Sequence, residues 1–168
     1  MSIHNTDPLA QHVRSLLEAS ATAQEAYISG IEIVIEHSTQ FLRIYIDNLD
    51  HTSMSMEKCI ILNREFSAIL DVDDPFPSAY TLEVSSPGLD RIIEVERDLQ
   101  RFQNFHIRIK RKQYRSKLDG VLLGYTTEGI EVLTAIDTRI VPFADISQMR
   151  LHPTDEEIDL LITGAKNE

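Results

Sequence analysis

Cysteine, the residue of disulfides and of most structural zinc sites, is almost absent from the sequence. Cys59 is the one cysteine among 168 residues, so an internal disulfide is impossible, which fits a reducing compartment. A structural zinc site would lack its usual thiolate ligands, and no two of the six histidines stand at the spacing of a ligand pair. We therefore expect a protein without a metal and without a cofactor.

Long apolar runs are missing as well. The longest apolar stretches are a few residues, which is too short for a transmembrane helix. The first fourteen residues have neither the basic start nor the apolar run of a signal peptide. The sequence thus predicts a cytoplasmic protein that does not contact a membrane.

Positive charge is scarce and is concentrated in one part of the chain. The net charge is −11, and residues 1–87 carry four basic and thirteen acidic side chains. Residues 91–117, in contrast, carry nine basic and three acidic side chains. An acidic body should repel bare nucleic acid and suit basic partners, although acidity often serves solubility alone.

Motifs for catalysis are absent from the sequence. It has no glycine-rich phosphate loop, and Ser85 and Ser86 follow a strand without the G-x-S-x-G turn of a hydrolase. The acidic run at 71–74 lacks the glycine and the final acid of a calcium loop. Cys59 falls on the apolar face of a helix, where packing is the expected role. We expect no enzyme, and a small hydrolase that uses one of the two serines is kept as an alternative.

The first half of the chain predicts an α+β domain. Asp7 followed by Pro8 is a good helix start, and apolar residues recur at helical spacing as far as about residue 26. Alternating and β-branched segments predict strands, and a second broad apolar face predicts another helix. The expected elements are a helix at 7–26, strands at 31–36 and 41–46, a helix at 56–70 and a strand at 80–85. The order αββαβ predicts a three-stranded sheet with helices on one face.

The second half is rich in strands. After a short helix at about 96–102, four or five short strands in about fifty residues predict a small β-barrel. Gly120 and Gly124 are placed where a strongly bent strand would need room. Thr154 and Glu157 form a capping-box pattern that would start a helix in the tail. The predicted organisation is a domain at 1–88, a linker with a short helix at 89–103, a barrel at 104–152 and an acidic tail at 153–168.

Six of the twelve residues from 106 to 117 are lysine or arginine, and we call this segment the basic band. Its cations are Arg108, Lys110, Arg111, Lys112, Arg115 and Lys117. Strand alternation places the side chains of 108, 110 and 112 on the same face. Such a stripe can neutralise phosphates, and Tyr114 could stack on an unpaired base. The alternative is an exposed hairpin whose charges prevent edge pairing.

A second pattern, which we call the junction motif, joins the end of a strand to a tight turn and to an adjacent Asp-Arg pair. The turn residues are Ser85, Ser86, Pro87 and Gly88, and Gly88 can adopt a positive φ. Asp90 and Arg91 follow directly. They either lock the turn through hydrogen bonds or bind a partner.

The segment from Tyr80 to Arg91, YTLEVSSPGLDR, closely resembles the signature of the RimP ribosome maturation factors. The stretches LRIYID at 42–47, MEKC at 56–59 and LDVDDP at 70–75 also resemble that family, as does Gly120. Two departures are Ile92-Ile93, where the family usually has Pro-Leu, and Asn104, where it usually has glycine.

The resemblance implies a fold, a function and a set of partners. The fold is an N-terminal α+β domain followed by an SH3-like or Sm-like barrel. The function is non-catalytic binding of the free small ribosomal subunit to assist its assembly. The partners are rRNA and a basic ribosomal protein, without a small-molecule substrate, for a protein that acts as a monomer. The other reading is an Sm-like regulator that binds free RNA, which predicts binding with a steep salt dependence.

Overall fold

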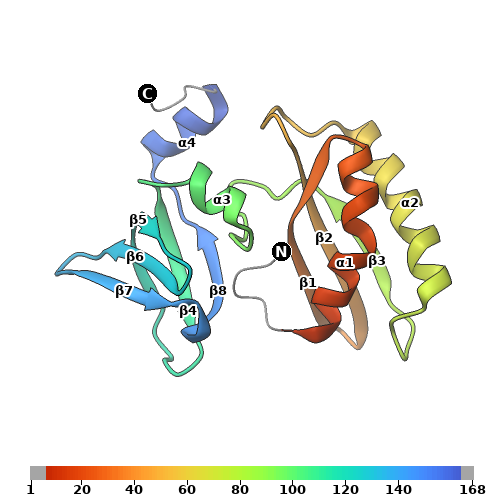
Figure 1. Ribbon diagram of the computed structural model, residues 1–168, viewed down its shortest axis with the longest axis horizontal. Coiled ribbons are helices and arrows are strands. Elements are labelled where there is room, and N and C mark those ends of the chain that lie inside the picture. The colour runs from red at the N-terminus through yellow and green to blue at the C-terminus, as the bar shows by residue number, and fades with distance from the viewer. Residues whose placement is uncertain (1–6, 164–168) are drawn as a thin grey trace. The chain divides into compact units, whose positions relative to one another are not determined.

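The computed structural model describes residues 7–163, and the chain divides into two compact units, one ending at Pro87 and one beginning at Gly88 (Figure 1). Residues 1–6 of the first expected domain and 164–168 of the expected tail lie outside the described part. Within the described residues, no helix is long and apolar enough to cross a membrane.

The first unit has the αββαβ order that the sequence predicts. Its elements are α1 (Pro8–Ala23), β1 (Ala26–Glu36), β2 (Thr39–Asn48), α2 (Met56–Asp73) and β3 (Thr81–Ser85). They form a sheet with the strand order β1-β2-β3, in which β1 is antiparallel and β3 is parallel to β2. A parallel pair needs a long crossover, and α2 supplies it.

Side-chain caps fix where both helices of this unit begin. The Asp7 carboxylate accepts a hydrogen bond from the Leu9 N–H at 3.0 Å, and the Ser55 hydroxyl accepts one from the Lys58 N–H at 3.1 Å. The prediction ended α2 too early, since the helix continues to Asp73 and stops at Asp74, which has a φ of 47°. Strand β1 was also predicted too short, because it begins at Ala26 and not at Ile31.

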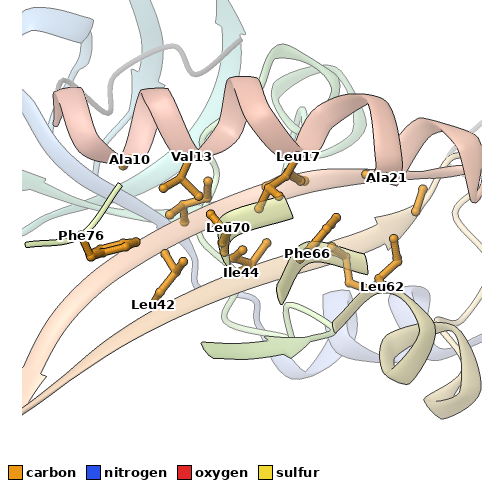
Figure 2. Packing of buried hydrophobic residues seen from close by; sticks show 14 residues of the cluster. Ala10, Val13, Leu17, Ala21, Leu42, Ile44, Leu62, Phe66, Leu70 and Phe76 are labelled. Carbon is orange, nitrogen blue, oxygen red and sulfur yellow. The ribbon is translucent and has the colours of Figure 1, made fainter. Parts of the chain in front are cut away.

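Both helices pack on the same face of the sheet, as predicted (Figure 2). Most of the fully enclosed side chains of this core come from α1 (Val13, Leu17, Ala21), β2 (Leu42, Ile44, Ile46) and α2 (Leu62, Phe66, Leu70). Burying a large aliphatic or aromatic side chain stabilises a fold by about 1.5–3 kcal/mol. The core therefore holds the sheet and its two helices as one body.

The second unit is an antiparallel sheet whose strands are preceded by one helix and followed by another in the sequence. Its elements are α3 (Glu96–Arg101), β4 (His106–Arg111), β5 (Leu118–Tyr125), β6 (Gly129–Leu133), β7 (Thr138–Pro142), η1 (Phe143–Asp145), β8 (Ile146–Leu151) and α4 (Asp155–Thr163). The strand order is β7-β6-β5-β4-β8, and no ladder joins β7 to β8 among the described residues. The sheet is thus not closed, and the expected barrel is not confirmed.

One edge of this sheet is covered by the chain itself. The Ile93 N–H donates to the Met149 carbonyl, and the Leu151 N–H donates to the Arg91 carbonyl, both at 2.9 Å. Ile92 forms an antiparallel bridge with Arg150. Residues 91–93 therefore run along the outer side of β8, while β7 is left as the other edge.

The two glycines singled out in β5 differ. A Cβ atom on Gly120 would lie 2.5 Å from the Leu133 carbonyl oxygen, so the close approach predicted there is confirmed. A Cβ atom on Gly124 would meet nothing within 4 Å, so the prediction for that residue was wrong. The irregular register between Leu122 and Gly124 is the local feature at that position.

Candidate functional site

The basic band lies on β4 and on the loop that joins it to β5. Ile107 and Ile109 are fully buried. The side chains of Arg108 and Lys110 alternate with them and point to the other face of the strand. Residues 112–117 form the loop, and each of them is exposed. The band therefore combines an outward strand face with an exposed basic loop.

The position of β4 decides between the two explanations of the band. Strand β4 pairs with β5 on one side and with β8 on the other. Charges on a central strand cannot serve to block edge pairing, so the protective explanation fails for Arg108 and Lys110. The positive charge on this strand therefore has another role, which for Arg108 is the ion pair with Asp119.

Four cations of the band form no ion pair within the described part of the chain, although Lys117 is near enough to Asp119 to help lower the pKa of that carboxyl. Lys110, Lys112, Arg115 and Lys117 are exposed, and no described carboxylate lies within ion-pair distance of them. In an acidic protein, an uncompensated group of this kind is where an anion is attracted most strongly. These four side chains are the centre of the candidate site, and we call them the open cations.

Arg108, in contrast, belongs to a row of paired charges. Its guanidinium donates twice to the Asp119 carboxylate, at 2.7 Å each, and holds the pKa of that carboxyl below its usual value. Arg150 lies directly opposite on β8 and donates to the Asp90 carbonyl at 3.2 Å. The row Asp119, Arg108, Arg150 and Asp90 thus joins one end of the junction motif to the basic band.

Arg150 was missed from the sequence. The strand that carries it, β8, was not predicted, because an irregular register near Ser147 interrupts the simple alternation. The alternation of Met149, Arg150 and Leu151 was the available signal, with the outer two side chains buried and Arg150 between them. A strand assignment there would have placed Arg150 beside Arg108.

Arg111 and Tyr114 form a stacked pair at the start of the loop. The Arg111 guanidinium lies 3.8 Å from the centroid of the Tyr114 ring, and Tyr114 is 55% exposed. Arg111 pairs across the ladder with the buried Ile146, and its Nε atom is buried without a hydrogen-bond partner. Arg111 therefore supports the aromatic ring, and Tyr114 is the accessible member of the pair.

The strand ends at Ser85 as the junction motif predicts, but the turn itself lies slightly later than predicted, at Leu89 and Asp90. Ser85 ends β3, Pro87 is buried, and Gly88 has a φ of 72°, which favours glycine. No hydrogen bond joins the hydroxyl of Ser85 or Ser86 to a described histidine, although a serine nucleophile needs such a base. The geometry of the described residues gives the hydrolase alternative no support.

Arg91 is held inside the second unit. Its guanidinium lies 3.5 Å from the carboxylate of Asp98, whose side chain is fully buried, and 5.1 Å from the ring centroid of Phe102. A buried arginine with an anionic partner on α3 is suited to fixing the chain after the turn. Asp90 remains exposed, so the two members of the acid–base pair have different surroundings.

The acidic run at the end of α2 and the thiol of Cys59 both have local explanations. Asp71 and Asp73 lie in the last turn of α2, and the Asp73 carboxylate is 2.7 Å from the His12 ring. Cys59 packs against the first core, and burial raises the pKa of its thiol. No group of three possible metal ligands occurs in residues 7–163.

The capping box at the start of α4 is confirmed. The Thr154 N–H donates to Glu157 at 2.8 Å, and the Glu157 N–H donates to the Thr154 hydroxyl at 3.3 Å. Glu157 also accepts from the backbone N–H of His106 and lies 3.0 Å from the His106 ring nitrogen. One carboxylate thus attaches the tail helix to the first residue of the basic band.

We expect α4 to detach in acid. Burial raises the pKa of Glu157, but hydrogen bonds from Thr154 and His106 outweigh it, and the pKa lies below its ordinary value of 4.5. A lowered pKa means that the stabilisation is complete above pH 4.5 and is lost as the pH falls through the lowered value. The protection factor of the His106 amide, from which the intrinsic slowing of exchange in acid has been divided out, should therefore stay high at pH 6 and fall toward pH 3.

Substitution gives the same result at neutral pH. Glu157→Ala should destabilise the attachment of α4 by about 1 kcal/mol, the usual cost of a lost cap. Glu156→Ala, at the exposed neighbouring position, is the matched control and should leave exchange at His106 unchanged. Equal exchange in the two variants would show that Glu157 does not hold the helix.

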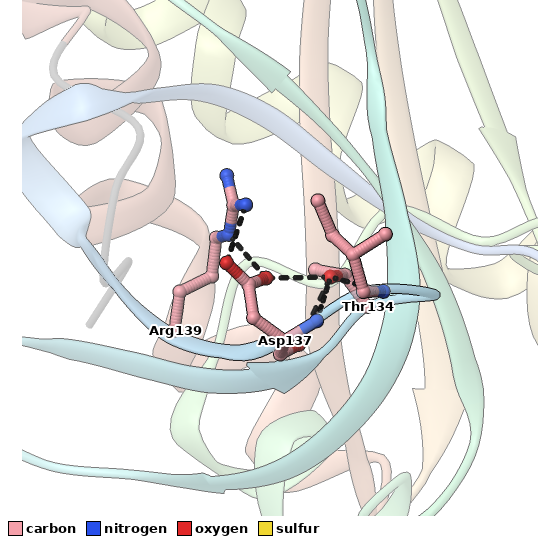
Figure 3. A network of polar contacts seen from close by, with 4 residues as sticks. Thr134, Asp137 and Arg139 are labelled. Carbon is pink, nitrogen blue, oxygen red and sulfur yellow. Dashed lines mark hydrogen bonds and ion pairs between the residues drawn. The ribbon is translucent and has the colours of Figure 1, made fainter.

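The tip of the β6–β7 hairpin is fixed by a network of polar contacts (Figure 3). The Thr134 hydroxyl donates to the Asp137 carboxylate at 2.7 Å. Arg139 donates to both oxygens of the same carboxylate, at 2.9 and 2.7 Å. Two side chains that donate to one carboxylate fix the turn and hence the register of the hairpin.

Comparison with known protein families identifies the first unit. The model of the RimP N-terminal domain matches residues 10–90, from α1 through the junction motif to Asp90. The match covers the two helices and three strands whose order and packing are described above. The resemblance first noted at residues 80–91 therefore extends over a whole folded domain, and the chain belongs to the RimP family of ribosome maturation factors.

Proposed function

We propose that this protein is a non-catalytic assembly factor that binds the free small ribosomal subunit in the cytoplasm as a monomer. Membership of a ribosome maturation family implies a ribosome-related partner. The observation that carries the finer proposal is the group of four open cations on a strand and loop of an otherwise acidic protein. The proposed site consists of Asp90, Arg108, Lys110, Arg111, Lys112, Arg115 and Lys117, with Arg91 and residues 85–88 in support.

Ribosomal RNA suits the open cations as a partner. Each lysine or arginine can neutralise one phosphate and release its counterions, which supplies affinity without sequence specificity. Tyr114 adds an aromatic surface on which an unpaired base can stack. The paired row from Asp119 to Asp90 would limit how much bare RNA the face attracts.

A basic ribosomal protein suits the remainder of the molecule. The first unit carries nine more acidic than basic side chains, and complementary charge increases the rate and selectivity of association. A factor with an acidic body and one basic band would thus contact protein and RNA with different surfaces. Such a division agrees with binding to an assembling ribonucleoprotein more than with binding to free RNA.

We further infer that the second unit is a small barrel of the SH3-like kind. Five short antiparallel strands in the order β7-β6-β5-β4-β8, with a 3-10 turn before the last strand, support this inference. Gly120 allows β5 and β6 to approach closely, as a strongly bent sheet requires.

Co-sedimentation tests the proposed function. We expect the full-length protein to sediment with free small subunits, and not with large subunits or joined ribosomes, at physiological salt. The binding should weaken with added salt in the manner of phosphate contacts. Binding to free RNA without binding to any subunit would instead favour the Sm-like regulator, and binding to neither would exclude both functions.

A further inference from the structure

The outer edge of β7 is an open strand with unused backbone groups. The Thr134 N–H donates to the Asp137 carbonyl, and the Phe143 N–H donates to the Glu128 carbonyl. Hydrogen-bonded pairs alternate along an antiparallel ladder, so Arg139 and Val141 also bond to β6. The backbone groups of Thr138 and Ile140 consequently point away from β6, and among the described residues no strand pairs with them.

The side chains around this edge are apolar and exposed. Ile140 is 71% exposed, Ile136 in the preceding turn is 85% exposed, and Leu133 on β6 is 45% exposed. Natural edge strands are usually protected by lysine, by proline or by a covering segment. Here Pro142 ends the open stretch, but the outward position on the edge itself is an isoleucine.

The other edge of the same sheet, at β8, is covered and not open. Residues 91–93 cover β8, as described above, so a second copy cannot join its β7 to the β8 of the first in a continuing sheet. Pairing of two β7 edges would bring together two chains that each carry a net charge of −11. A copy of this chain is therefore a poor occupant of the open edge.

Charge indicates what kind of occupant fits. The hairpin contains Glu128, Glu131 and Asp137 against a single cation, Arg139, which is already paired with Asp137. A strand that brought lysine or arginine would be attracted to this hairpin, while its alternate apolar side chains would cover Ile140. The register of the hairpin is held by the Thr134–Asp137–Arg139 network, so the edge is already in a strand conformation (Figure 3).

We propose that β7 is a strand-addition site for an extended, basic segment of a partner protein. The segment pairs with the outward backbone groups of Thr138 and Ile140 and places apolar side chains against Ile140 and Leu133. The identification of that partner as a ribosomal protein rests on the proposed function, whereas the site itself does not. The second unit then offers the basic band to RNA and the β7 edge to protein.

A designed peptide tests the site directly. The probe is an alternating lysine–valine heptapeptide added to the full-length protein, observed by amide NMR and hydrogen exchange. Added protection should appear at the amides of Thr138 and Ile140, which are open beforehand, and not at those of Arg139 and Val141, which are already bonded to β6. A lysine–proline heptapeptide of equal charge cannot pair as a strand and should give no protection.

A proline substitution separates the backbone contact from general attraction. Ile140→Pro removes an N–H that does not bond to β6, so the ladder should survive, and peptide affinity should fall by about tenfold. Ile140→Val keeps the N–H and should bind as the wild type does. Thermal unfolding of both variants checks that the hairpin is intact, and Glu131→Lys supplies a second, non-proline variant with weakened binding.

Three results would overturn the proposal. They are equal binding of the two peptides, unchanged affinity of Ile140→Pro, and a concentration-dependent dimer of the free protein that Ile140→Pro dissolves. Co-sedimentation with small subunits separates this site from the proposed function. Normal sedimentation without peptide binding refutes only the β7 site, and peptide binding without sedimentation upholds the site while refuting the ribosomal role.

Discussion

Reversing the four open cations should abolish binding to the small ribosomal subunit. The variant carries Lys110→Glu, Lys112→Glu, Arg115→Glu and Lys117→Glu. Four phosphate contacts contribute about three units to the slope of log affinity against log salt, so affinity should fall roughly a hundredfold or more at physiological salt. All four side chains are exposed and have no ion-pair partner in the described chain, so the fold should be unaffected.

The measurement is co-sedimentation over a series of salt concentrations, with Arg64→Glu as the control. Arg64 is an exposed cation on α2 of the first unit, outside the band. Its reversal changes the net charge but should change affinity little. If Arg64→Glu weakened binding as much per charge as the band variant, the attraction would be one of net charge and the band would not be a site.

Asp98→Ala should unfold or strongly destabilise the second unit. The substitution removes the buried carboxylate that lies 3.5 Å from the Arg91 guanidinium, and breaking a buried pair in this way costs about 3–5 kcal/mol. Since Arg91 also directs the segment that covers β8, the loss should spread to that edge of the sheet. Denaturant unfolding gives the size of the effect, and hydrogen exchange at Leu151 locates it.

A double variant provides the comparison. Replacing both partners, with Arg91→Met and Asp98→Leu, removes the two buried charges together and should recover most of the lost stability. If the double variant lost as much stability as the two single variants lose together, Arg91 and Asp98 would not interact. In that case the position of Arg91 directly after the turn would have to be explained by binding a partner.

The first unit could be predicted from the sequence because its signals are local. These signals are the helical spacing in α1 and α2, the caps Asp7 and Ser55, and the alternation of β2. Each can be recognised from residues that are close together in the sequence. The parallel pairing of β3 with β2 could not be predicted in this way, because it depends on contacts across the whole length of α2. The order of the elements predicted a three-stranded sheet but not the direction of β3 within it.

The second unit shows where pattern reasoning fails. The central position of β4 decides how the basic band is interpreted, and no local feature of residues 106–111 reports which strands lie beside them. Likewise, β7 is the open edge because residues 91–93 cover the other edge at β8, and those residues are more than fifty positions before β8 in the chain. The open cations were visible in the sequence, but Arg150 became apparent only with the strand that carries it.

The covered edge of β8 also bears on the order of events during protein synthesis. The strand β8 pairs with β4 and with residues 91–93, so both pairings must wait until Leu151 has been made. The first unit is contiguous from α1 to β3, so all of its core residues have been synthesised much earlier. On the ribosome, the nascent chain should therefore fold its acidic domain first, while β4 and the basic loop stay without their last strand.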